Sequence, residues 1–161
     1  MKKLTKIIAI DPDIAKSGVA TLEVSTRKLT ITTLEFPRLI EHIRCEHELS
    51  IVNNQTLIVV VEAGWLNTKS NFHGQTGARA QKIAKNVGSN HQTGKHIIEM
   101  CEWIGVDVVL QKPLIKRWKG VGGKITHEEI SYFTGITTKT SQDGRDAALI
   151  AWNYAGFPIK V

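Results

Sequence analysis

Two short runs of consecutive apolar residues, each ending in a carboxylate, constrain the fold more than any other feature of this sequence. Residues 7–10 (IIAI) precede Asp11, and residues 57–61 (LIVVV) precede Glu62. A continuous apolar run of this length is typical of a strand buried on both faces of a sheet. The two runs therefore predict a layered α/β protein in which an acid follows each of two buried strands.

Turn residues and hydrophobic periodicity divide the rest of the chain into further elements. We expect strands at 4–11, 18–24, 28–34, 57–61 and 106–110, and helices at 38–53, 75–104 and 143–154, with a short helix opening at a capping box of Thr126 and Glu129. The first three strands form an antiparallel meander. The helix after them is a crossover, which favours a fourth strand parallel to the first.

Two helices carry further expectations. In the helix at 38–53 we expect Leu39, Ile40, Ile43 and Leu49 to form the apolar side. The long helix at 75–104 contains glycines at which it could bend.

Four carboxylates are expected to meet at one edge of the sheet. Parallel neighbouring strands would place Asp11 and Glu62 side by side, where the ligand sites of α/β sheets gather. Asp143 and Asp146 are three residues apart, on one face of the last helix. By themselves they could be the acids that helix N-termini favour. Beside Asp11 and Glu62 they would repel one another unless a cation bound, and Mg²⁺ or Mn²⁺ prefers such oxygen ligands. The pattern predicts a two-metal site for phosphodiester hydrolysis.

Acids are excluded from two basic segments, residues 63–98 and 108–126, in a chain of 161 residues with a net charge of +6. Such segments suit a phosphate backbone better than an ordinary solvated surface, which mixes both signs. The candidate DNA-binding residues are Trp65, Lys69, Arg79, Lys82, Lys85, Lys112, Arg117 and Lys119. Trp65 could stack on a base or be a core residue.

The motifs IIAIDPDIAKSGVATL, VVVEAGW, KIAKNVGSNHQTGK, IKRWKGVGGK and DGRDAALIAW occur in that order. Together they resemble the RuvC-like Holliday junction resolvases of the RNase H-like nuclease superfamily. The resemblance implies a five-stranded mixed sheet of order 3-2-1-4-5, with the first three strands antiparallel and helices on its flanks. It also implies that Asp11, Glu62, Asp143 and Asp146 are catalytic metal ligands. Asp13 replaces the family's usual glycine after Asp-Pro.

The resemblance also places a catalytic lysine in the glycine-rich loop at 114–125, which we expect to be mobile. Lys116 and Lys124 are the preferred candidates, Lys124 first, with Lys119 in reserve. The implied activity is a divalent-metal-dependent endodeoxyribonuclease that cuts four-way junctions or related branched DNA as a homodimer. The alternatives are a junction-binding protein with little cleavage activity and a small actin-like nucleotide binder.

Other features limit the setting of the protein. No apolar run approaches the roughly 20 residues of a membrane span, and two cysteines without metal spacing fit a reduced compartment. We expect residues 1–161 to form a single nuclease domain that is cytoplasmic, without membrane partners, and encoded by a bacterium, a phage or a mobile element.

Overall fold

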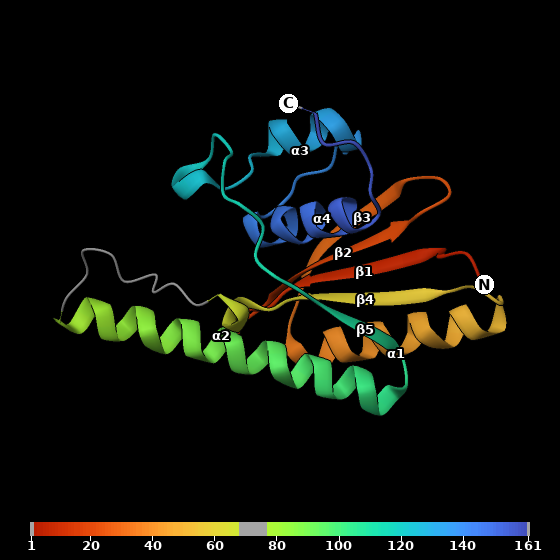
Figure 1. Cartoon of the computed structure of the whole chain (residues 1–161), viewed down its shortest axis with the longest axis horizontal. Coiled ribbons are helices and arrows are strands. Elements are labelled where there is room, and N and C mark those ends of the chain that lie inside the picture. Colours follow the sequence, from red (N-terminus) through yellow and green to blue (C-terminus); the bar gives the residue numbers. More distant parts are fainter. Residues whose placement is uncertain (1, 68–76, 161) are drawn as a thin grey trace.

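The computed structural model describes residues 2–67 and 77–160, and it contains the predicted mixed sheet (Figure 1). The strands are β1 (Lys6–Asp11), β2 (Ser17–Glu23), β3 (Lys28–Leu34), β4 (Leu57–Glu62) and β5 (Asp107–Gln111). They lie in the order β3-β2-β1-β4-β5. β1 pairs antiparallel with β2 and parallel with β4, so the predicted meander and crossover are both confirmed.

Helices cover both faces of the sheet (Figure 1). They are α1 (Phe36–Val52), α2 (Gly77–Ile104), α3 (His127–Thr134) and α4 (Gln142–Tyr154). Successive side chains of a strand point to opposite faces, so β1 serves two cores. Ile8 and Ile10 pack with α1 and α2, whereas Ile7 and Ala9 pack with α4. Burial of β1 on both faces explains its continuous apolar sequence.

The helices differ from expectation in a few places. α1 begins at Phe36, two residues earlier than predicted, because Pro37 is well suited to the first helical turn. Leu49 is 51% exposed, so its predicted inward position is wrong. The buried face of α1 runs through Leu39, Ile43 and Ser50, and the helical period turns Leu49 away from that line.

Two other predictions concern helical glycines and helix ends. α2 is one continuous helix that includes both Gly88 and Gly94. The capping box of α3 is confirmed, with Thr126 and Glu129 each bonding the backbone of the other.

Among the described residues, no helix combines the length and the apolar character that a membrane span requires.

Candidate active site

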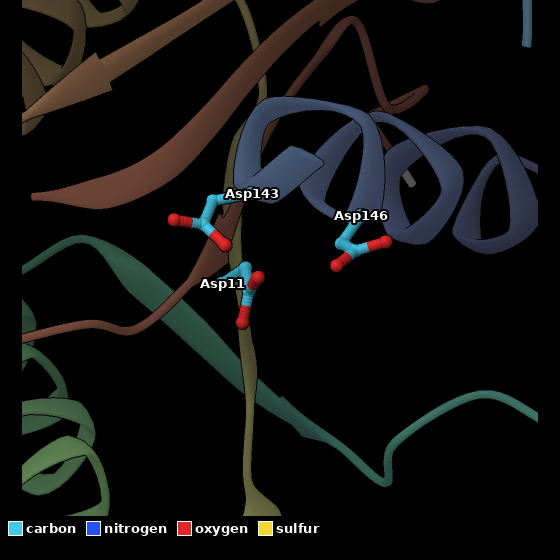
Figure 2. Close-up of side chains that lie close together, drawn as sticks. All are labelled: Asp11, Asp143 and Asp146. Carbon is cyan, nitrogen blue, oxygen red and sulfur yellow. The ribbon is translucent and has the colours of Figure 1, made fainter. Parts of the chain in front are cut away.

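Three of the four predicted carboxylates meet at the carboxyl end of β1 (Figure 2). One oxygen of each of Asp11, Asp143 and Asp146 lies within 4.8 Å of the others. Asp11 is the last residue of β1, and the two other aspartates lie in the first turns of α4. Ser141 caps that helix, since its side chain accepts a hydrogen bond from the backbone N–H of Gly144. A strand end and a helix start thus build the cluster together.

Glu62 approaches this cluster from the neighbouring strand. The parallel register pairs Ile10 with Val61, so Glu62 follows on β4 beside Asp11 on β1. In the described part of the chain, Glu62 is outside the group within 4.8 Å, but it lines the same pocket as Asp11 and Asp146. The structure therefore brings all four predicted acids to one edge and packs three of them tightly.

The electrostatics of the cluster favour a bound cation. Burial, followed by the charges of Glu62, Asp146 and Asp143, raises the pKa of Asp11 to about 8 from an ordinary value of 3.8. Burial also raises the pKa values of Glu62 and Asp143, and neighbouring acids add to both. Partly buried carboxylates with raised pKa values are a donor set that fits a hard divalent ion, which would stabilise their charged forms.

Two of the predicted lysines face these acids. Lys116 and Lys124 line the pocket that contains Asp11 and Glu62. Lys124 Nζ lies 3.6 Å from Asp146 Oδ2, and its charge opposes the rise in the pKa of Asp11. Lys119 lines a different pocket, with Thr126 and Tyr132. The structure thus separates Lys119 from the two lysines that adjoin the carboxylates.

The loop that carries these lysines is folded on itself by backbone hydrogen bonds. The N–H of Trp118 donates to the Gly123 carbonyl at 3.0 Å, and the N–H of Gly120 donates to the Lys124 carbonyl at 2.9 Å. Trp118 is buried in the core on the α4 side of the sheet. Gly123 has a φ of +75°, and a Cβ added there would lie 2.9 Å from the Lys116 carbonyl oxygen. The glycines therefore serve a closed turn.

A pocket of about 600 Å³ connects the acids to α2. Asp11 and Glu62 line it together with Trp65 and His91. The Trp65 ring packs closely on Gly94, where an added Cβ would lie 2.7 Å from Trp65 Cζ3. The His91 ring meets Trp65 edge-on, with the ring centroids 6.0 Å apart. Trp65 is half-buried, so it combines a packing contact with an open position in the pocket.

The remaining basic candidates lie on two exposed segments. The N-terminal half of α2 projects past the sheet and exposes Arg79, Lys82 and Lys85 (Figure 1). The segment after β5 exposes Lys112, Arg117 and Lys119. Lys69 lies outside the described residues.

Asp13 has a structural role in the β1–β2 turn. Its Oδ1 accepts hydrogen bonds from the N–H groups of Ala15 at 2.8 Å and Lys16 at 3.4 Å. Its Oδ2 accepts from Asn90 Nδ2 at 3.4 Å, and Asn90 Oδ1 accepts from the N–H of Ile14. Asp13 thus fastens the turn to α2, and its charge helps to raise the pKa of Asp143.

Sequence reasoning missed three residues that shape the site: Gly18, Asn90 and Gln142. Gln142 donates a hydrogen bond to Asp146 at 2.9 Å. Its position four residues before Asp146 in a helix is a spacing at which such pairs meet, so this contact had a detectable signal. Gly18 contacts the Asp143 backbone, and Asn90 bonds the β1–β2 turn. These contacts join segments far apart in the chain, so no local sequence signal predicts them.

Comparison with known proteins agrees with the architecture. No protein-family model matches the sequence, and no curated protein does. Among solved structures, T. thermophilus RuvC in complex with Holliday junction substrate is similar, with a TM-score of 0.52 and 16% sequence identity over 94% of this chain and 92% of that chain. This chain has a RuvC-like fold. The five-stranded order of its sheet is the predicted RNase H-like order.

Proposed function

We propose that this protein is a divalent-metal-dependent endonuclease that hydrolyses phosphodiesters of branched DNA, in particular four-way junctions. The observation that carries the proposal is the group of Asp11, Asp143 and Asp146 within 4.8 Å, with Glu62 on the same pocket. Its support comes from the opposing lysines, from the basic surfaces and from the fold, which it shares with a RuvC that was solved with a Holliday junction.

The proposed chemistry divides the site between acids and lysines. Asp11, Glu62, Asp143 and Asp146 would hold Mg²⁺ or Mn²⁺. Two such ions, when bound, supply a water of lowered pKa and neutralise charge on the leaving 3′ oxygen. Lys124 extends over the acids, 3.6 Å from Asp146, where its ammonium group is positioned to stabilise negative charge on the phosphate. Lys116 lines the same pocket and would add positive charge beside the phosphate.

DNA would lie along the pocket between α2 and the segment after β5. The exposed Arg79, Lys82 and Lys85 on one side and Lys112, Arg117 and Lys119 on the other would contact phosphates. Lys69 is proposed as a further phosphate contact on the basis of the sequence alone. Trp65 is positioned in the pocket to stack on an unpaired base.

A homodimer is part of the proposal, because a four-way junction is two-fold symmetric and its resolution needs paired cuts. The contact that we propose is α2, whose apolar residues include Ile83, Val87, Ile97, Ile98 and Met100. Ile97 is buried in the core of its own chain, so it is not available for a partner. Light scattering measures the oligomeric state at micromolar concentration, and the cleavage assay measures activity at the same concentration. A monomer with full cleavage activity would contradict the dimer.

The test is cleavage of a labelled four-way junction, a fork and a linear duplex with Mg²⁺ and with Mn²⁺. Asp11→Asn, Glu62→Gln, Asp143→Asn and Asp146→Asn should each lose cleavage and keep junction binding. Asp107→Asn, at an exposed position that begins β5, is the matched control and should cut normally. Junction binding without any cleavage by the wild type would instead identify a binding protein.

A further inference from the structure

Gln142, the first residue of α4, uses every hydrogen-bonding group of its side chain. Its Nε2 donates to Asp146 Oδ1 at 2.9 Å and to the Ile125 carbonyl at 3.2 Å. Its Oε1 accepts from Arg145 Nη2 at 2.9 Å. A primary amide has two N–H donors, so both donated bonds can form at once.

The orientation of this amide is dictated by its neighbours. A guanidinium group only donates hydrogen bonds, and an ionised carboxylate and a backbone carbonyl only accept them. The amide oxygen must therefore face Arg145, and the amide nitrogen must face Asp146 and Ile125. A flipped amide would lose all three bonds, so one conformation of Gln142 is strongly preferred.

Arg145 anchors the same network to the lysine loop. Its Nε donates to the Ile125 carbonyl at 3.0 Å, and its Nη1 donates to the Thr140 carbonyl at 2.9 Å. Ile125 is buried and directly follows Lys124. Gln142 and Arg145, both on α4, thus donate to the carbonyl of Ile125, the residue after Lys124. The same helix carries Asp146.

We propose that Gln142 is a positioning residue that orients the carboxylate of Asp146 and, with Arg145, holds the Lys124 segment against it. This inference rests on the metal site of the proposed function. The bond from Gln142 occupies Oδ1 of Asp146, while Oδ2 lies 3.6 Å from Lys124 Nζ. A carboxylate held in this way loses less conformational entropy when it binds an ion.

The test is titration of the full-length protein with Mn²⁺ in the absence of DNA, in which the Mn²⁺ concentration at half-saturation is obtained by fitting the dependence of Tm on Mn²⁺ concentration to one-site binding. Gln142→Met keeps the length of the side chain but removes its donors. It should raise the Mn²⁺ concentration at half-saturation by about 10- to 100-fold, which is typical for loss of a group that orients a metal ligand. Ser141→Ala is the matched control, because it removes the helix cap and leaves the bond to Asp146 intact. It should lower Tm but change the half-saturation concentration by less than about threefold, since a cap contributes mainly to helix stability.

Melting in EDTA shows whether each variant is folded. If folded Gln142→Met binds Mn²⁺ as tightly as Ser141→Ala does, the positioning role is wrong. If Gln142→Met does not fold, Arg145→Met replaces it, because it removes the donor to Oε1 and frees the amide to rotate. Unchanged Mn²⁺ binding in Arg145→Met would also overturn the proposal. A wild-type protein that binds Mn²⁺ but cuts no DNA would overturn the proposed function alone, and weaker Mn²⁺ binding by Gln142→Met would still support the positioning role.

Discussion

Gly18 lies directly against the backbone of Asp143: a Cβ atom at residue 18 would be 2.0 Å from the Asp143 carbonyl oxygen. Gly18 also pairs with Asp11 across β1 and β2. The absence of a side chain at this position allows the start of α4 to rest on β2 beside the end of β1. This close approach brings the aspartates of α4 to Asp11.

Gly18→Ala should therefore disrupt the carboxylate cluster. The added methyl meets backbone atoms, which cannot move aside without shifting α4, so we expect a loss of about 1–3 kcal/mol in the free energy of unfolding. Mn²⁺ binding should weaken as well. Urea unfolding and Mn²⁺ titration are the measurements.

Gly88→Ala is the control for this substitution. Nothing lies within 4 Å of a Cβ at Gly88, which is inside α2. Alanine there should stabilise the protein by up to about 1 kcal/mol. An equal effect of the two substitutions would contradict the role assigned to Gly18.

The buried carboxyl of Asp11 should lower the stability of the metal-free protein as pH rises from about 4 to about 8. The pKa of Asp11 is about 8 in the folded protein and has an ordinary value of 3.8. Between these values the folded state retains a proton that the unfolded state has lost, so raising the pH favours unfolding. Asp11→Asn removes this dependence, because its amide stays neutral. In EDTA at pH 8.5 the variant should be the more stable by up to about 5 kcal/mol, because each unit of pKa shift corresponds to about 1.4 kcal/mol.

Urea unfolding of both proteins at pH 5.5 and 8.5 measures this effect. Other titrating groups, such as His42, whose pKa is lowered by burial, contribute to both proteins. The difference between the two proteins therefore reports on Asp11 together with its coupling to the neighbouring acids of the cluster. Mn²⁺ at pH 8.5 should stabilise the wild type and have a smaller effect on Asp11→Asn. A wild-type advantage at pH 8.5 in EDTA would contradict the raised pKa.

Lys124 and Lys119 should have separable roles. Lys124→Ala removes the ammonium group beside Asp146 and should lower the single-turnover cleavage rate by about 10²-fold or more. Its junction affinity in Ca²⁺ should stay nearly unchanged. Lys119→Ala should instead weaken binding and reduce the salt-dependence slope by about one. Lys116→Ala should resemble Lys124→Ala, because both residues line the acidic pocket. Proportional losses of rate and affinity in all three variants would show that the loop only positions DNA.

Trp65 should contribute to junction affinity through its ring. Stacking on a base is worth about 1–3 kcal/mol, so Trp65→Ala should weaken junction binding in Ca²⁺ by about 5- to 150-fold. Trp65→Phe keeps a stacking face and should lose much less. Because the ring also packs on Gly94, melting of each variant is measured in parallel. If Trp65→Ala lowers Tm but binds the junction normally, Trp65 is only a packing residue.

The strands and helices were largely predictable from the sequence, because their signals are local. The apolar runs before Asp11 and Glu62 indicate strands buried on both faces, and the structure buries β1 and β4 in this way. The capping box of Thr126 and Glu129 is likewise a short-range pattern, and both of its bonds form. The helical crossover then leaves few topologies for strands that must bury both faces.

Tertiary packing decided which side chains meet. The sequence predicted that four acids meet at one edge of the sheet. Only the fold shows that Asp11, Asp143 and Asp146 pack within 4.8 Å while Glu62 joins them from the next strand. It also shows that Lys124, rather than Lys119, adjoins them. These distances depend on contacts between segments far apart in the chain, such as Gly18 with Asp143. Periodicity and capping report only on neighbours within a few residues, so they specify the elements, whereas packing between the elements sets the geometry of the site.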